Sequence, residues 1–219
     1  MRQRITGRRM GGVYLSALAV LLLFFVPRVA RAEAEVEGFF LGLGLHTDNL
    51  GAEDRKEGSP PGSVYIDEDG GGLDLQLGWA FTESFLLRLR LSVAEHDTDK
   101  DNIDFYSGSG VFEAAYLFRL GRPLRPYVMG GLGGFFMSAE EGDAYSYETT
   151  GSGAVIGGGL VYFFNDHFAL DTCLRLSFIN WANKTAETKL PDGTTFRVET
   201  PIEEEGEGGN LMIGLSYYF

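Results

Sequence analysis

Apolar residues recur at every second position in eight separate segments, and this period of two constrains the fold more than any other feature of the chain. Consecutive side chains of a β-strand point to opposite faces, so the period indicates strands. In Phe85–Val93, for example, one face is apolar while the other carries Arg88 and Arg90. The eight segments are Phe39–Thr47, Leu73–Phe81, Phe85–Val93, Tyr106–Phe118, Tyr127–Met137, Ala154–Phe164, Phe168–Phe178 and Leu211–Phe219. We therefore predict an all-β fold.

The lengths of the segments and of their connections favour a membrane barrel over a soluble β-sandwich. Each segment has about 9 to 13 residues, and a tilted strand needs about 9 to 11 to cross a bilayer. The short connections are 82–84, 120–126 and 165–167, and they alternate with the long polar connections 48–70, 95–105, 138–152 and 180–208. A sandwich gives no reason for this alternation. We predict an eight-stranded antiparallel up-and-down transmembrane β-barrel with short periplasmic turns and long extracellular loops.

Aromatic residues cluster at the strand ends next to the short turns. Membrane barrels carry such girdles at the membrane–water interfaces. The predicted periplasmic belt consists of Trp79, Phe81, Phe85, Tyr116, Phe118, Tyr127, Tyr162, Phe164, Phe168, Tyr217 and Phe219. The alternative reading of these residues is the core of a sandwich.

The first 32 residues have the three parts of a signal peptide. Four arginines precede an apolar run from Val13 to Val26, and a small-residue stretch ends at Ala32. The run of about 14 residues is shorter than the roughly 20 that a spanning helix needs, which disfavours a signal anchor. We predict cleavage near Ala32, a single barrel domain over residues 33–219, and location in the cell outer membrane.

The predicted mature chain is strongly acidic. Six of the 18 basic residues are arginines within residues 1–32 and all 31 acidic residues follow, which leaves a formal charge of −19. Nucleic acid is bound through clusters of Lys and Arg, so it is not an expected partner. Cys173 is the only cysteine, which excludes an intrachain disulfide.

Three stretches resemble the small outer-membrane β-barrel family that includes OmpA- and OmpX-like proteins. They are Arg125–Gly134, Gly157–Asp171 and the terminal Leu211–Phe219. The resemblance extends over residues 33–219, and it implies a fold but selects no function. The terminal stretch looks like the family's assembly signal, which implies that the outer-membrane assembly machinery reads Ile213, Leu215, Tyr217 and Phe219. The peptidoglycan-binding domain of full-length OmpA-like proteins has no counterpart here, so that anchoring role is not expected.

Charged residues occupy the strand faces that would point into the barrel. An eight-stranded barrel is just wide enough for side chains to fill it, and buried charges must pair. We expect an ion-pair network that closes the lumen, with a narrow passive pore as the alternative. Its members are Asp74, Arg88, Arg90, Glu113, Asp171 and Arg175. Inward glycines such as Gly42 and Gly44 would make room for the arginines, and Cys173 would fill space. This lining disfavours a tunnel for hydrophobic ligands.

The expected outer loops are acidic, with dense runs at 67–69 and 203–207. Such runs are usually solvated, but carboxylates also bind hard divalent cations. Asp97, Asp99 and Asp101 have calcium-loop spacing, yet Asn102 and Gly108 stand where an EF-hand needs Gly and Glu, so only weak calcium binding is possible there. No cofactor is expected.

Catalysis is disfavoured because no strand carries a His-x-Ser pair. Outer-membrane lipid A deacylases and acyltransferases need His and Ser within hydrogen-bond reach, and His46 with Ser92 is the one pair that merits a test. The favoured function is a non-enzymatic barrel that presents acidic loops for adhesion, envelope stabilisation or ion binding. Its expected partners are outer-membrane lipid, lipopolysaccharide and the assembly machinery, with divalent cations possible. We expect a monomer.

Overall fold

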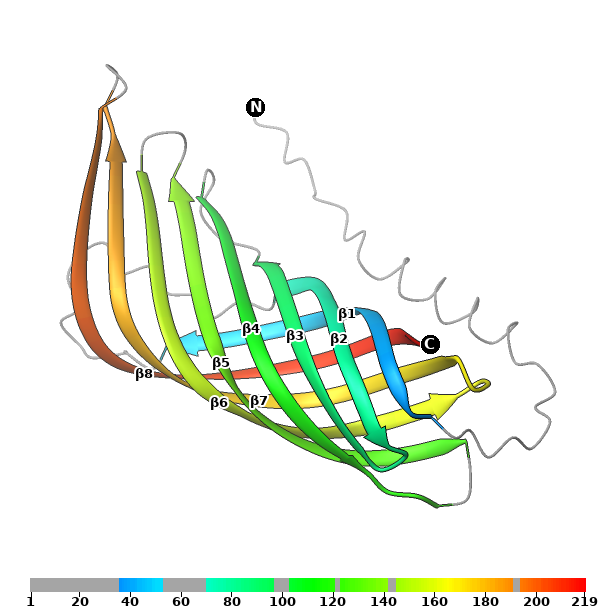
Figure 1. The fold of residues 1–219 in the computed structure, drawn as a ribbon. Coiled ribbons are helices and arrows are strands. Elements are labelled where there is room, and N and C mark those ends of the chain that lie inside the picture. Colours follow the sequence, from blue (N-terminus) through cyan, green and yellow to red (C-terminus); the bar gives the residue numbers. More distant parts are fainter. Residues whose placement is uncertain (1–35, 53–69, 97–102, 121–122, 142–144, 191–193) are drawn as a thin grey trace, which may run out of the picture.

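The computed structural model describes residues 36–52, 70–96, 103–120, 123–141, 145–190 and 194–219, and the regular structure in these ranges is all strand (Figure 1). The strands are β1 Gly38–Ala52, β2 Gly70–Thr82, β3 Phe85–His96, β4 Ile103–Leu117, β5 Leu124–Glu141, β6 Tyr145–Phe163, β7 Phe168–Lys189 and β8 Thr195–Tyr218. No helix in the described ranges is both long and apolar enough to cross a membrane. The predicted signal peptide lies outside the described residues.

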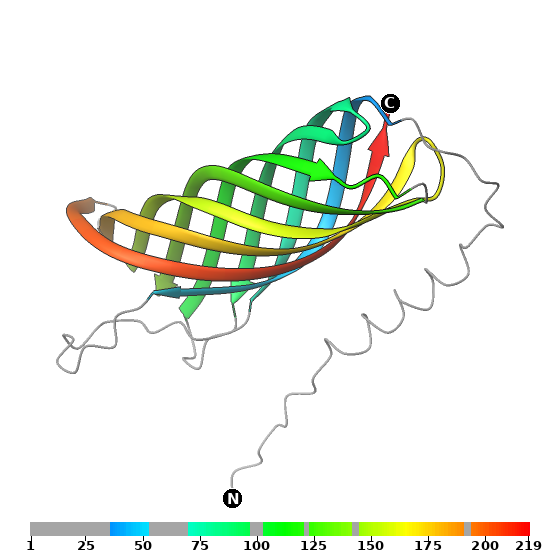
Figure 2. The ribbon, with the colours of Figure 1, turned by 90° about the horizontal axis from the view of Figure 1, so that it is seen from below.

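Each strand pairs antiparallel with its neighbour in sequence, and β8 returns to pair with β1. The closing register runs from Phe40 opposite Tyr218 to Ala52 opposite Gly206. Figure 2 shows the resulting closed wall of strands. The predicted eight-stranded antiparallel up-and-down barrel is therefore confirmed.

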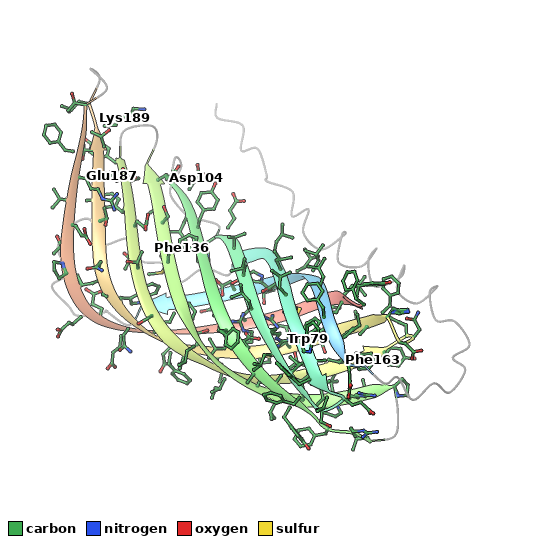
Figure 3. The ribbon with its side chains drawn as sticks, viewed as in Figure 1. Trp79, Asp104, Phe136, Phe163, Glu187 and Lys189 are labelled. Atoms are coloured by element: carbon green, nitrogen blue, oxygen red, sulfur yellow. The ribbon has the colours of Figure 1, made fainter. Side chains whose placement is uncertain are left out.

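Charged side chains line the inside of the barrel wall and apolar side chains cover its outside, which is the reverse of a soluble protein. Arg88 and Arg90 of β3 are buried inside, whereas Val93 of the same strand is exposed on the outside. Every strand contributes to an outer apolar band, and Trp79 of β2, labelled in Figure 3, is one of its exposed residues. Representative band residues, 52–70% exposed, are Leu43, Leu73, Val93, Phe112, Leu132, Ile156, Leu174 and Leu211. An apolar exterior of this kind is compatible with the hydrocarbon core of a membrane. A closed barrel also leaves no unpaired strand edge in that core.

Most of the predicted aromatic belt lies on the outside near the short turns. Trp79, Phe81, Phe85, Tyr116, Phe118, Phe168 and Phe219 are 40–68% exposed. Tyr127 is a correction, because it is 3% exposed and points into the lumen. The glycines of β5 weaken the alternation around it, so the sequence did not reveal on which face Tyr127 lies.

Two of the long connections, 138–152 and 180–208, are another correction, since most of their length is strand. β6, β7 and β8 have 19, 22 and 24 residues, about twice what a bilayer crossing needs. The expected loop 180–208 is largely a hairpin in which Lys189 pairs with Thr195. A bulge between Trp181 and Asn183 shifts the register of β7 with both neighbours, and bulges bend strands. Figure 1 shows β5 to β8 curving upward beyond the rest of the barrel.

Candidate functional site

A layer of paired charges crosses the middle of the lumen, with Glu113 of β4 at its centre. Glu113 Oε2 accepts a hydrogen bond from Arg88 Nε at 2.6 Å. Its Oε1 lies 3.1 Å from Arg175 Nη2 and 3.5 Å from Arg90 Nε. Glu113 and Arg90 are fully buried. One carboxylate thus holds three guanidinium groups from β3 and β7.

Asp171 of β7 forms a second branch of the layer. Arg88 Nη1 donates to Asp171 Oδ2 at 3.1 Å and to Gln76 Oε1 at 3.1 Å. Tyr127 donates its phenolic hydrogen to Asp171 Oδ1 at 2.8 Å, and the Arg88 guanidinium lies 5.5 Å from the Tyr127 ring centroid. These contacts connect β2, β3, β5 and β7 across the lumen.

Asp74 of β2 is the third acid of the layer. Its Oδ2 is 2.8 Å from His46 Nδ1, and its Oδ1 is 3.7 Å from Arg90 Nη1. The layer therefore contains three carboxylates and three guanidinium groups, whose formal charges balance. Arg90 has the longest contacts, and none of its three nitrogens makes a hydrogen bond with the described part of the chain.

All six residues predicted for the lumen network lie within 4 Å of a partner in this layer. Sequence reasoning missed Tyr127 and Gln76 as members, although Gln76 shares the inward face of β2 with Asp74. Gly42 and Gly44 also face inward, but a Cβ there would meet Ser216 and Met212 rather than an arginine. Cys173 is buried in the lumen wall.

A Ser, a His and an acid meet at the outer end of the lumen. Ser107 donates to Asp48 Oδ2 at 2.7 Å and lies 2.9 Å from His96 Nε2. Asp48 Oδ2 is also 3.6 Å from His96 Nε2. In a catalytic relay the acid orients the imidazole through the nitrogen opposite the serine. Here the serine and the acid share one nitrogen, so this arrangement is not a relay.

The pair His46 and Ser92 is not joined either. Ser92 Oγ is hydrogen-bonded to Ser109 Oγ at 2.7 Å, and the polar contact of His46 is with Asp74. The calcium-like residues Asp97, Asp99 and Asp101 lie outside the described residues. In the described ranges, no group of three or more His, Cys, Asp or Glu side chains is arranged to hold a metal ion.

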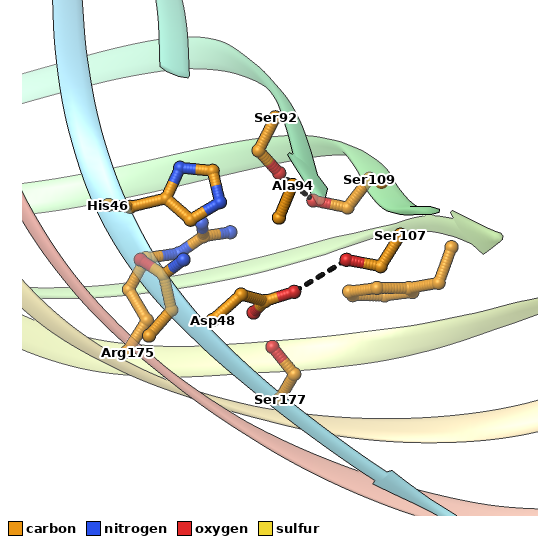
Figure 4. A pocket seen from close by; sticks show the side chains of 11 residues that line it. His46, Asp48, Ser92, Ala94, Ser107, Ser109, Arg175 and Ser177 are labelled. Atoms are coloured by element: carbon orange, nitrogen blue, oxygen red, sulfur yellow. Dashed lines mark hydrogen bonds between the residues drawn. The ribbon is translucent and has the colours of Figure 1, made fainter. Parts of the chain in front are cut away.

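A polar pocket lies between the charged layer and the outer end of the barrel (Figure 4). Its volume is about 320 Å³, including its opening to solvent. His46, Asp48 and Arg175 reach into the same space in Figure 4. The lining residues are His46, Asp48, Ser92, Ala94, Ser107, Gly108, Ser109, Phe135, Arg175, Ser177 and Asn210.

Other contacts narrow the opposite end of the lumen. Arg125 Nη1 donates to the Glu83 carbonyl at 3.0 Å, and its guanidinium lies 4.9 Å from the Phe163 ring centroid. Phe40 stacks on Tyr218 with ring centroids 4.9 Å apart. A smaller pocket of about 190 Å³, open to solvent and lined by residues that include Val36, Leu117 and Tyr218, lies at this end. The lumen is thus filled at its middle, with a pocket toward each end.

A closed antiparallel barrel with an apolar exterior and a charged, filled interior defines the class of transmembrane β-barrels. The chain belongs to the family described as outer membrane protein beta-barrel domain, which matches residues 16–219. It is therefore an outer-membrane barrel. No curated protein matches the chain.

Solved structures with a similar fold are also small outer-membrane barrels. Neisserial surface protein A (NspA) is 16% identical with a TM-score of 0.62, covering 84% of this chain and 99% of its own. A major outer membrane protein from Thermus thermophilus is 13% identical with a TM-score of 0.58, covering 83% and 99%. Ail of Yersinia pestis, in complex with the heparin analogue sucrose octasulfate, is 16% identical with a TM-score of 0.51, covering 84% and 99%. At these identities the similarity shows the fold alone.

Proposed function

We propose that this protein is a non-enzymatic surface anchor whose projecting β6–β8 sheet binds basic, extended polypeptide segments, which is an adhesion role. The observation that carries the proposal is a free strand edge. β8 pairs with β1 only from Gly206 onward, so Thr195–Glu205 has a strand partner on its β7 side alone among the described residues. An exposed strand edge is a template for an added strand.

The negative charge of the projecting sheet favours a basic partner. Within 145–152, 179–189 and 195–208 there are seven acidic and three basic residues. Glu203, Glu204 and Glu205 are consecutive and exposed on the free edge. Acidic side chains attract a cationic segment and repel a polyanion. A sulfated glycan of the kind bound to Ail does not suit this surface.

Apolar and charged residues alternate along the free edge of β8, and this further restricts which peptide sequences fit. Phe196 and Val198 are 57% and 61% exposed, and they alternate with Arg197 and Glu199. A strand added beside them would place every second side chain against the apolar pair. The matching segment therefore alternates apolar with mainly basic residues.

The other functions considered have less support. Metal binding lacks a ligand cluster in the described ranges, and the Ser107, His96 and Asp48 geometry does not favour catalysis. A passive pore would require a path through the charged layer, whose paired side chains Arg88, Arg90 and Glu113 are at most 3% exposed.

The test is binding of a synthetic peptide with alternating lysine and valine to purified protein in detergent micelles. Glu203→Lys with Glu205→Lys should weaken binding about ten-fold or more at low salt and reduce its salt dependence. Glu95→Lys with Asp104→Lys makes the same charge change on exposed positions of β3 and β4, and it should have little effect. Equal losses in both double variants, or no binding by the unaltered protein, would reject the adhesion proposal.

A further inference from the structure

We propose that the segment bound at the free edge of β8 runs antiparallel to this strand, with basic residues toward its amino end and an acidic residue toward its carboxyl end. This inference rests on the proposed function and adds the direction and the charge order of the partner. The free edge is Thr195–Glu205. Because cross-strand neighbours meet in a fixed order, the order of charges along this edge determines the order of charges that fits it.

The side chains of the free edge lie alternately on two faces, which continue the inside and the outside of the barrel wall. Asn210 and Met212 of β8 are buried in the lumen, and Ile202 packs against the buried core. Strand side chains alternate, so the even-numbered residues of this stretch face inward and the odd-numbered ones outward. The outward row of the free edge consists of Thr195, Arg197, Glu199, Pro201, Glu203 and Glu205.

The outward row is basic near the hairpin tip and acidic toward the barrel. Glu205 stands opposite Asn180 of β7, so no base offsets its charge from directly across that strand pair. Arg197 stands opposite Glu187 at 3.2 Å, but its side chain is 62% exposed. A guanidinium has five donors, so Arg197 can bind a second carboxylate on its open side. Opposite charges stabilise a strand pair and like charges destabilise it. A matching segment therefore has an acid beside Arg197 and bases beside the glutamates.

The direction follows from the strand that precedes the free edge. β1 runs antiparallel to β8, and their pairing ends at Ala52 opposite Gly206. A segment that is antiparallel to the free edge therefore lies end to end with β1 and keeps the pattern of the whole sheet. Antiparallel pairing is also slightly more stable per residue than parallel pairing. The amino end of the segment then lies at Glu205 and its carboxyl end at Thr195, so its bases come first and its acid last.

Two synthetic peptides of identical composition test the direction by calorimetric titration of the purified full chain in detergent micelles. Both have the length of the free edge and alternate charged residues with valine or threonine. In the first peptide, antiparallel alignment sets lysines opposite the three outward glutamates and a glutamate opposite Arg197. The second peptide has the reversed sequence, which in the same alignment sets like charges opposite Arg197 and Glu203. The first should bind about five-fold or more tightly than the second.

The outcomes separate this inference from the adhesion proposal on which it rests. Equal affinities, or tighter binding of the reversed peptide, would overturn the antiparallel direction and leave the adhesion proposal standing. If neither peptide binds, the adhesion proposal falls and the inference falls with it.

Arg197→Glu tests the residue that sets the direction. It should remove most of the preference for the first peptide and should favour a third peptide, in which lysine replaces the glutamate. Lys189→Glu is the matched control, because it makes the same charge change on β7, opposite Thr195 at the tip of the hairpin (Figure 3). It should keep the preference. Heat-modifiable gel mobility checks that both variants are folded. A preference that survives Arg197→Glu, or that Lys189→Glu abolishes equally, rejects this role of Arg197.

Discussion

Glu113 shows how one residue organises the lumen of this barrel. It faces inward between Val111 and Ala115 of β4, which are also buried. A buried carboxylate is costly unless it is paired, and Arg88, Arg90 and Arg175 surround this one with countercharges. Removing it would leave three guanidinium groups facing one another without their shared partner.

Glu113→Ala should therefore lower the free energy of unfolding by about 3 to 5 kcal/mol, the cost of breaking a buried ion pair. The measurement is denaturant unfolding in lipid vesicles. Glu148→Ala on the exposed part of β6 is the control, with an expected change within about 0.5 kcal/mol. A loss below about 1 kcal/mol for Glu113→Ala would show that the layer contributes little.

At the level of strands, Gly159 of β6 leaves room for the ring of Tyr127 on β5. Gly159 pairs directly with Tyr127, and a Cβ at Gly159 would overlap the Thr172 backbone carbonyl and stand 2.9 Å from the Tyr127 ring. The absent side chain lets the ring lean over β6 and reach Asp171. Gly130, on the outward face of β5, has its nearest potential Cβ contact at an ordinary 3.6 Å.

Gly159→Val should crowd the Thr172 backbone, displace the Tyr127 ring and lower the free energy of unfolding by about 1 to 3 kcal/mol, as overpacking does. Gly130→Val makes the same change on the outer face of the neighbouring strand, where we expect an effect within about 0.5 kcal/mol. Both are measured by denaturant unfolding. If the two variants lose equal stability, strand propensity rather than crowding against Thr172 and Tyr127 is the cause.

The end of β8 is a second element with a testable role. Phe219 donates its backbone N–H to the Phe39 carbonyl at 3.0 Å, and its ring lies 4.9 Å from that of Tyr217. Deleting Phe219 should reduce the amount of barrel in the outer-membrane fraction several-fold without reducing export to the periplasm. Heat-modifiable gel mobility measures this. Phe118→Ala removes another exposed aromatic near the short turns and should assemble normally. Equal barrel yield with and without Phe219 would refute an assembly role.

For the whole molecule, the charged layer closes the lumen at its middle. Among the described residues the polar pocket lies on the outer side of this layer, and a smaller pocket lies on the short-turn side. Side chains from strands on opposite walls meet at Glu113 and Asp171. The barrel is thus suited to hold the projecting sheet rigidly rather than to pass solutes.

We therefore expect no steady single-channel openings when the folded protein is inserted in a planar bilayer. Arg119→Ala with Glu83→Ala, which removes an ion pair of 2.8 Å at the short-turn end, should also be silent. Steady openings by the unaltered protein that vanish when Arg88 and Arg90 are replaced would establish the pore instead.

The sequence by itself determined the barrel and the identity of its inward charges. Side chains alternate strictly along a strand, so the leucines that alternate with Arg88 and Arg90 indicated which face of β3 is outward and which is inward. The same reasoning identified Asp74, Glu113, Asp171 and Arg175 as inward. Where glycines interrupt the alternation, as around Tyr127, the assignment was wrong.

Only the tertiary structure decided which of these residues meet and how far the strands extend. Contacts such as Arg88 with Asp171 join strands that are far apart in sequence, and barrel closure brings them together. The polar hairpin of β7 and β8 lacks the apolar period of a membrane crossing, so it was expected to be a loop. Cross-strand pairing with β6 makes it a sheet, because backbone hydrogen bonds and neighbouring side chains stabilise strands without any lipid-facing pattern.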